Sequence, residues 1–248
     1  MITTIINSIK AYFGAFEVIS KLKLWKYFAI PIFISVFTAI VIMSSAYFLA
    51  DDVGAYIDNI WTWEFGKETF AVISKFLSGL LILIIGLILY KNIVMALSAP
   101  FMSPVSEKIE KHFLGEEHTH RKTNTSEQLI RGIRISVRNL SRELGLTLIV
   151  LIIGIIPVIG LISAPLIFLI QAFYAGFGNM DYTLERHFSY KESITFVKRN
   201  KGIAIGNGIV FILFLLIPVI GIIIVFPLSV TAATTETIKK IQVKRLSE

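Results

Sequence analysis

Long runs of apolar residues, separated by short polar segments, dominate the pattern of the chain. The first uncharged run covers residues 27–50. As a helix it would be about 36 Å long, enough to cross a hydrocarbon core of about 30 Å. A second run, residues 69–90, carries one charge, Lys75, near its start. The pattern predicts two transmembrane helices here, followed by a helix interruption at Pro100 and Pro104.

Two later apolar runs, residues 144–180 and 202–235, carry no charge, but the same five residues, Ile-Pro-Val-Ile-Gly, break each of them. The residues of these breaks are Pro157, Gly160, Pro218 and Gly221. A proline and a glycine three positions apart in an apolar run are typical of a helix break, and Pro165 predicts a second one. The first arms would be about 20 and 22 Å long, shorter than a bilayer. We expect two re-entrant helical hairpins, with four tilted full spans as the alternative.

Two further segments have the spacing of amphipathic helices. Residues 1–26 spread four lysines among apolar residues and lack the continuous run of a cleavable signal peptide, which favours an interfacial helix. Residues 127–143 place four arginines within about 80° of one another on a helical wheel, opposite an apolar face. The arginines are Arg131, Arg134, Arg138 and Arg142. They could attract an oxyanion or lipid headgroups, or form an ordinary solvated face.

Composition and charge narrow the class of protein. Of the 248 residues, 55% are apolar and 17% charged, and the mean hydropathy is +0.75, which excludes a water-soluble globule. We predict an all-α integral membrane protein with a single membrane domain over residues 1–248. The formal charge of +7 favours lipid phosphates or an anionic solute over nucleic acid. Residues 51–68 form the one acidic loop, so the positive-inside rule places that loop outside and both termini in the cytoplasm.

Several kinds of chemistry are missing from the sequence. The chain has no cysteine, and it lacks phosphate-binding, nucleophile-elbow and zinc-protease motifs. His118 and His120, beside two glutamates, are a weak metal pattern because a flexible loop does not fix coordination geometry. We therefore expect no enzyme activity, no cofactor and no resident metal. Passive passage of a solute, an accessory role or a lipid-facing scaffold remain.

The order of these parts resembles the CysZ family of bacterial sulfate permeases over nearly the whole chain. Ala-Pro-Phe at residues 99–101, followed by Glu107, is similar to the family's APF…AEQLE stretch. The first Ile-Pro-Val-Ile-Gly break and the segment from Asp181 through His187 to Arg199 continue the match. The resemblance implies two long transmembrane helices, two hemi-penetrating hairpins, assembly into homo-oligomers, and uptake of sulfate for cysteine synthesis.

The same resemblance implies an anion-binding loop before the first span, where the family has Gly-hydrophobic-Arg-Arg. The corresponding residues here are Lys23, Leu24, Trp25 and Lys26. Lysine keeps the positive charge but lacks the bidentate fork with which arginine binds oxyanions. We predict that Lys21 and these two lysines gather sulfate or a related oxyanion at the cytoplasmic mouth. We also predict that Glu107 is a structural or gating partner of a nearby arginine.

Two functions from different classes follow. The first is an oligomeric channel or permease of the bacterial inner membrane, in which Arg131, Arg134 and Arg138 form a second positive surface. The second is a non-transporting scaffold whose in-plane helices and arginines hold anionic lipid or a partner protein.

Overall fold

The computed structural model of the chain describes residues 1–58, 67–115, 124–154, 157–215, 217 and 220–246. Within these residues all regular secondary structure is helical, which confirms the predicted all-α class. In chain order the elements are α1 (Ile2–Lys21), the 3-10 helix η1 (Leu24–Phe28), α2 (Ala29–Asp58), α3 (Lys67–Leu114), α4 (Thr125–Ile153), α5 (Pro157–His187), α6 (Tyr190–Arg199), α7 (Lys201–Leu215) and α8 (Ile220–Leu246).

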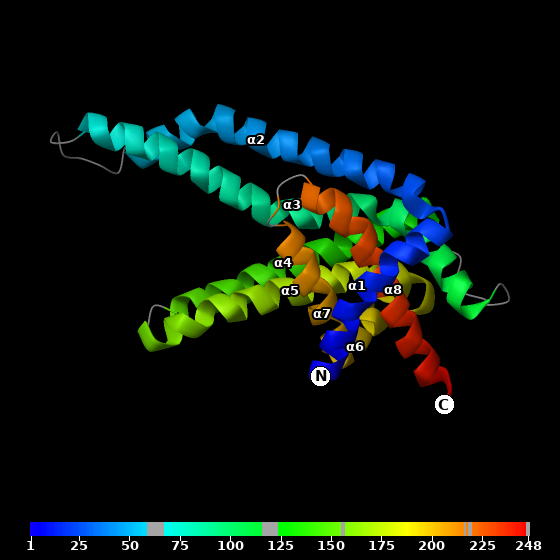
Figure 1. Cartoon of the computed structure of the whole chain (residues 1–248). Coiled ribbons are helices and arrows are strands. Elements are labelled where there is room, and N and C mark those ends of the chain that lie inside the picture. Colours follow the sequence, from blue (N-terminus) through cyan, green and yellow to red (C-terminus); the bar gives the residue numbers. More distant parts are fainter. Residues whose placement is uncertain (59–66, 116–123, 155–156, 216, 218–219, 247–248) are drawn as a thin grey trace.

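The helices α2 and α3 lie side by side and project from the remainder of the molecule (Figure 1). Residues 24–56, which include η1 and most of α2, are long and apolar enough to cross a membrane. Most of their side chains are exposed, including Phe33 at 69% and Phe37 at 59%. Such a contiguous apolar surface suits contact with lipid. The predicted span at residues 27–50 therefore coincides with a candidate membrane helix.

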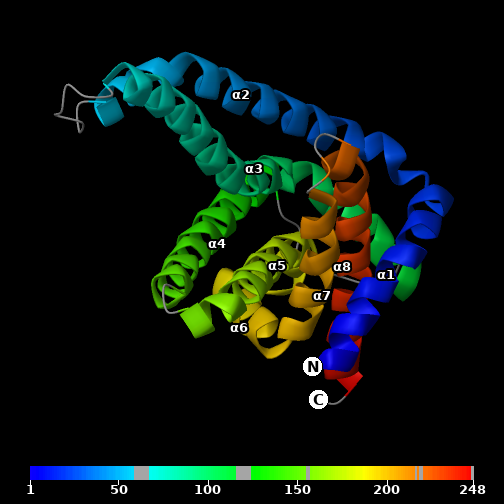
Figure 2. The same cartoon turned by 60° about the vertical axis from the view of Figure 1, so that its left-hand side comes forward.

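The helix α3 is continuous over 48 residues. The predicted second span, residues 69–90, lies in its first half and stays a prediction, because many of its side chains fall outside the described ones. Lys75 in this half pairs with Asp51 of α2 at 2.6 Å. The predicted interruption at Pro100 and Pro104 is wrong, since both prolines lie inside the helix. Figure 2 shows α3 changing direction along its length. A helix can include a proline by bending rather than by ending.

The next pair, α4 and α5, meets at the first Ile-Pro-Val-Ile-Gly break. The expected boundary at residue 144 is absent, because α4 continues from the arginine-rich segment to Ile153. A change from charged to apolar residues alters what a helix faces but does not end it. Gly154 caps α4, and Pro157 opens α5 at a position where a missing N–H costs little. The predicted second interruption at Pro165 is wrong, since this proline lies inside α5.

The outer surface of the α4–α5 tip is strongly apolar. Its exposed side chains include Leu148 at 58%, Ile152 at 59%, Leu161 at 81% and Ile162 at 64%. Within the described residues, 161–187 are a second segment that is long and apolar enough to cross a membrane. The tip therefore presents to its surroundings the kind of surface that lipid covers.

The helices α7 and α8 form a third pair, and both cross α5 at a steep angle (Figures 1 and 2). The 15 residues of α7 match the short arm expected from the sequence. Gly221 lies in the first turn of α8, as Gly160 does in α5, whereas Pro218 lies outside the described residues. The two breaks thus separate helices as predicted, and the depth of both hairpins in a membrane stays a prediction.

The N-terminal helix α1 is amphipathic. It packs on α7 and α8 with an inner face made of Ser8, Tyr12, Ala15 and Ile19. Phe13 and Phe16, on the other face, are 84% and 60% exposed. These aromatic side chains, together with nearby lysines, fit the predicted interfacial helix.

Candidate functional site

A short loop of cations precedes α2, where the anion site is predicted. Leu24 and Phe28 of η1 are 0% and 1% exposed, and they anchor the loop in the core. Lys23 and Lys26 alternate with these anchors and are exposed, as is Lys21 at the end of α1. The structure therefore brings the three predicted lysines to one exposed loop. Leu24, which the prediction included in the anion site, is completely buried.

The backbone of this loop is unusual at Lys23, whose φ is 53° and ψ is 42°. Among the described residues it is the one non-glycine residue with a positive φ. A side chain with a Cβ costs about 1–2 kcal/mol in this left-handed conformation. Glycine at the aligned position of the family that the sequence resembles would avoid that cost. Nearby, Trp25 donates from Nε1 to the Ser20 hydroxyl at 3.3 Å, and its ring meets Phe16 edge-on.

Tyr27 brings a further cation to the same place. Lys108 of α3 donates to the Tyr27 hydroxyl at 2.6 Å, and its Nζ lies 4.5 Å from the ring centroid. The Nζ of Lys26 lies 5.4 Å from the same centroid. Cations favour the face of an aromatic ring, so Tyr27 can hold both lysines despite their mutual repulsion. The start of α2 therefore concentrates positive charge from α1, η1 and α3, an arrangement that attracts anions.

The predicted arginine surface divides into two parts, because Arg131 points inward. Its Nε and Nη2 donate to the two carboxylate oxygens of Asp181 at 3.0 and 2.9 Å. Further bonds reach the Phe188 carbonyl at 2.8 Å and the Ser193 hydroxyl at 2.6 Å. Burial lowers the pKa of Arg131, but the charge of Asp181 outweighs it and raises the pKa. Arg131 is thus occupied in joining α4 to α5 and α6.

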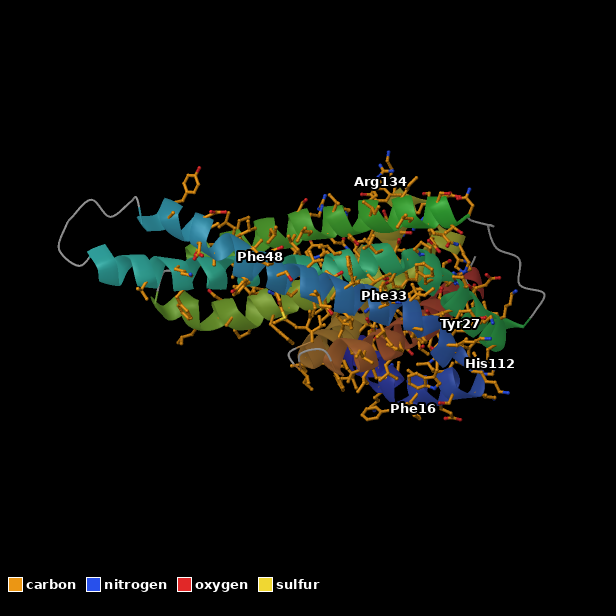
Figure 3. All side chains as sticks on the ribbon, turned by 90° about the horizontal axis from the view of Figure 1, so that it is seen from above. Phe16, Tyr27, Phe33, Phe48, His112 and Arg134 are labelled. Carbon is orange, nitrogen blue, oxygen red and sulfur yellow. The ribbon has the colours of Figure 1, made fainter. Side chains whose placement is uncertain are left out.

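The other three arginines lie nearer the surface. Arg134 stacks over the Tyr190 ring at 4.0 Å, and Arg138 lies 5.0 Å from the Phe177 centroid. Figure 3 shows Arg134 pointing away from the helices. Arg142, one turn further, is exposed. Of the four arginines on the wheel, Arg134, Arg138 and Arg142 thus remain on the outer side of α4, and their binding of an anion or of lipid stays a prediction.

A buried charge cluster joins α3 to α5. Arg186 donates from Nε and Nη2 to the Glu110 carboxylate at 3.2 and 3.0 Å. His187 meets the other carboxylate oxygen at 2.5 Å. Burial raises the pKa of Glu110, but the bond with His187 and the charge of Arg186 outweigh it and lower the pKa to about 2. Arg186 also donates to the hydroxyl of Ser106 at 2.8 Å, so the cluster is well satisfied.

Glu107, the predicted partner of a nearby arginine, lies near the surface of α3. Its carboxylate lies 3.1 Å from Lys111, one turn along the same helix, and is 36% exposed. The carboxylate on this helix that pairs with a buried arginine is Glu110, three positions on. A gating role for Glu107 stays a prediction.

A second buried pair joins α3 to α4. Lys91 and Glu143 lie 2.5 Å apart, with side chains that are 7% and 4% exposed. Lys91 directly follows an uncharged run, residues 76–90, and Glu143 directly precedes another, residues 144–180. A charge at the end of an apolar run is the sequence feature that could have identified them. Glu110 and Arg186 carry no comparable local signal, because they are 76 residues apart and only the tertiary fold shows that they meet.

The weak metal pattern at His118 and His120 lies outside the described residues. Across the parts of the chain that the structure describes, no three histidines or carboxylates are grouped to hold a metal ion.

Comparison with known protein families matches residues 11–225 to the family described as Sulfate transporter CysZ/Etoposide-induced protein 2.4. The matched region is most of the chain and contains the lysine loop before α2 and the buried charge pairs of α3. Comparison with curated proteins finds no match.

Proposed function

Because this chain belongs to the family of the sulfate transporter CysZ and etoposide-induced protein 2.4, we propose that it is a permease for sulfate or a similar oxyanion. At the level of the family it is a sulfate-transporter-like membrane protein rather than an enzyme. The proposal adds that the anion enters the cytoplasm down its electrochemical gradient and supplies cysteine synthesis. It also adds a homo-oligomeric channel, in contact with membrane lipids, in the bacterial inner membrane.

The observation that carries this proposal is the lysine cluster at the start of α2. Lys23 and Lys26 are exposed, and no described carboxylate forms an ion pair with either of them. Lys108 comes from another helix and donates to Tyr27, the residue that follows Lys26 in the chain. Cations that converge without acidic partners raise the local concentration of anions and lower the energy of an anion that passes.

The surface of α4 and α5 supports the proposed hemi-penetrating hairpins. From residue 144 to Ile153, α4 carries no charge and mostly exposed apolar side chains. This stretch is about 15 Å long, half of a hydrocarbon core of about 30 Å. In this proposal the tips of the hairpins dip into the membrane from the cytoplasmic side, and both termini lie in the cytoplasm.

The test is uptake of radiolabelled sulfate into liposomes that contain the purified protein. The double variant Lys23→Glu, Lys26→Glu reverses the charge of the loop, and we expect it to abolish uptake. Lys10→Glu is the matched control, since Lys10 is an exposed lysine of α1 away from the loop. Wild-type uptake by a correctly folded double variant would overturn the assignment of the site, and absence of any anion flux in the wild type would overturn the permease.

The surface of α4 favours a second function, a non-transporting membrane scaffold. Ile130 and Val137 are 66% and 57% exposed, beside the exposed Arg134 and Arg142. Apolar side chains flanked by arginines bind anionic bilayers. A scaffold predicts flotation with anionic liposomes that the double variant Arg134→Glu, Arg142→Glu loses, together with no flux of sulfate, sulfite, phosphate or chloride.

A further inference from the structure

We propose that the groove between α6 and the end of α8 binds a soluble organic anion that carries phosphate groups. The site is separate from the lysine loop and goes beyond the proposed permease function. The groove has a volume of about 670 Å³ and opens to the surface. Ligand sites for small molecules typically measure about 300–1,000 Å³. The groove is therefore far larger than a sulfate ion requires.

The charge of the groove selects an anion. Lys191, Arg199 and Lys240 line it, and no ion pair with a carboxylate is formed by any of them in the described part of the chain. The one acidic side chain in its wall is Glu192, whose carboxylate accepts the backbone N–H of Ser189 at 2.8 Å. Glu192 thus caps its own helix, and the three cations outnumber it. Arginine and lysine together suit a ligand with several phosphate oxygens.

The apolar wall of the groove indicates that the ligand has a second, uncharged part. Phe188 and Phe196 line one side, with ring centroids 5.1 Å apart and planes tilted by 31°. Val243 of α8 lines the groove as well. A free inorganic anion gains nothing from these side chains, whereas an aromatic or aliphatic moiety can pack on them.

The wall formed by α6 is held in place before any ligand arrives. Arg131 of α4 donates to the Phe188 carbonyl and to the Ser193 hydroxyl at the start of α6. The same arginine grips Asp181 of α5. A preformed groove binds more tightly, because the ligand does not have to order it. Arg131 therefore links the wall of the groove, where a ligand would bind, to α4 and α5.

The position of the groove favours a soluble ligand over a lipid headgroup. Figure 1 shows α6 at the end of the molecule where both termini lie, away from the tip of the α2–α3 pair. The proposed topology places this end in the cytoplasm. A phosphorylated solute with an aromatic ring, such as a nucleotide, combines the two required parts.

The experiment measures binding of ATP to the purified full-length protein by equilibrium dialysis, with inorganic phosphate and sulfate in parallel. We expect saturable ATP binding that is roughly tenfold tighter than binding of phosphate or sulfate. Arg199→Glu should weaken ATP binding by roughly tenfold or more, since it replaces an attractive charge by a repulsive one. Lys198→Glu is the matched control, because Lys198 is exposed on the same helix but does not line the groove.

Three results would overturn the proposal: no ATP binding, equal losses in the two variants, or binding only to phosphatidylglycerol vesicles, which would identify a lipid site. The same variants in the sulfate uptake assay keep the two proposals distinguishable. If ATP does not bind and sulfate uptake is normal, the groove proposal fails and the permease proposal stands.

Discussion

The side-chain amide of Asn179 donates to the side-chain oxygen of Asn207, with 2.9 Å between Nδ2 and Oδ1. Asn207 in turn donates to the Ser229 carbonyl at 2.9 Å, and its backbone carbonyl accepts from the Tyr12 hydroxyl at 2.7 Å. Asn207 is 1% exposed, so these bonds form away from water. One residue of α7 therefore joins this helix to α1, α5 and α8.

We expect Asn207→Leu to lower the free energy of unfolding by about 2–4 kcal/mol, because it leaves the Asn179 amide buried and unpaired and removes the bond to the Ser229 carbonyl. Chemical unfolding in detergent micelles measures the loss. Asn200→Ala is the control, since Asn200 makes a local bond to the Phe196 carbonyl at a half-buried helix end. Equal losses in both variants would contradict a special role for Asn207.

Close approach of α5 and α7 depends on Gly208, because a Cβ there would collide with the carbonyl group of Ala172. Gly208→Ala should force the helices apart and lower the free energy of unfolding by about 1–3 kcal/mol or more. Gly145→Ala in α4 is the opposite case, since no atom lies within 4 Å of the added Cβ. It should raise the stability by up to about 1 kcal/mol, so thermal unfolding should shift the two variants in opposite directions.

Acid should weaken the contact between α3 and α5 through Glu110. Its pKa is about 2 in the folded protein against an ordinary value of 4.5. The stability that this carboxylate contributes is therefore fully present above pH 4.5 and is lost as the pH falls towards 2. The difference corresponds to about 3 kcal/mol of unfolding free energy.

Unfolding of the wild type and of Glu110→Gln between pH 5 and pH 2.5 isolates this contribution. We expect the variant to start less stable, since Arg186 loses its partner, and to change less with pH. Identical pH dependence in both proteins would show that other carboxylates cause the loss.

Replacing either Lys91 or Glu143 alone should lower the stability of the protein strongly, whereas replacing both by apolar residues should lower it little. Lys91→Met leaves a buried carboxylate uncompensated and should cost about 3–5 kcal/mol. Adding Glu143→Leu removes that charge and should recover most of the stability. Unfolding of both single variants and the double variant completes the cycle, and additive losses would contradict the coupling.

Lys23→Gly should stabilise the loop before α2 by up to about 1 kcal/mol, because glycine adopts the left-handed conformation without strain. Lys21→Gly lies at a helical position and should instead cost up to about 1 kcal/mol. Melting temperatures of the two variants compare a glycine at a position with positive φ, residue 23, with a glycine at a helical position, residue 21. A loss of stability in both would contradict the strain at Lys23.

The helical class and the candidate span at residues 27–50 could be predicted, because a long uncharged run in lipid must satisfy its own backbone hydrogen bonds. Helix ends were harder to predict. Pro157 opens a helix, whereas Pro104 and Pro165 lie within helices, and the local sequence does not separate these cases. The difference depends on which neighbouring helices pack around each proline.

The candidate site shows the same division between local and tertiary information. Lys21, Lys23 and Lys26 could be identified because they lie close together in the sequence. Lys108 was not, since it reaches Tyr27 across 81 residues. The helical wheel grouped Arg131 with the other arginines of α4. Its inward orientation depends on Asp181 of α5, a contact that only the tertiary structure shows.

The two buried charge pairs of α3 have a consequence for how the chain enters the membrane during synthesis. Lys91 and Glu110 leave the ribosome 52 and 76 residues before Glu143 and Arg186, their respective partners. A charge without its partner is costly in hydrocarbon. If the chain inserts as proposed, the second half of α3 therefore stays in contact with water until α4 and α5 have been made. In the proposed topology biogenesis is then stepwise: the α2–α3 tip inserts first, and the later helices dock onto α3 afterwards.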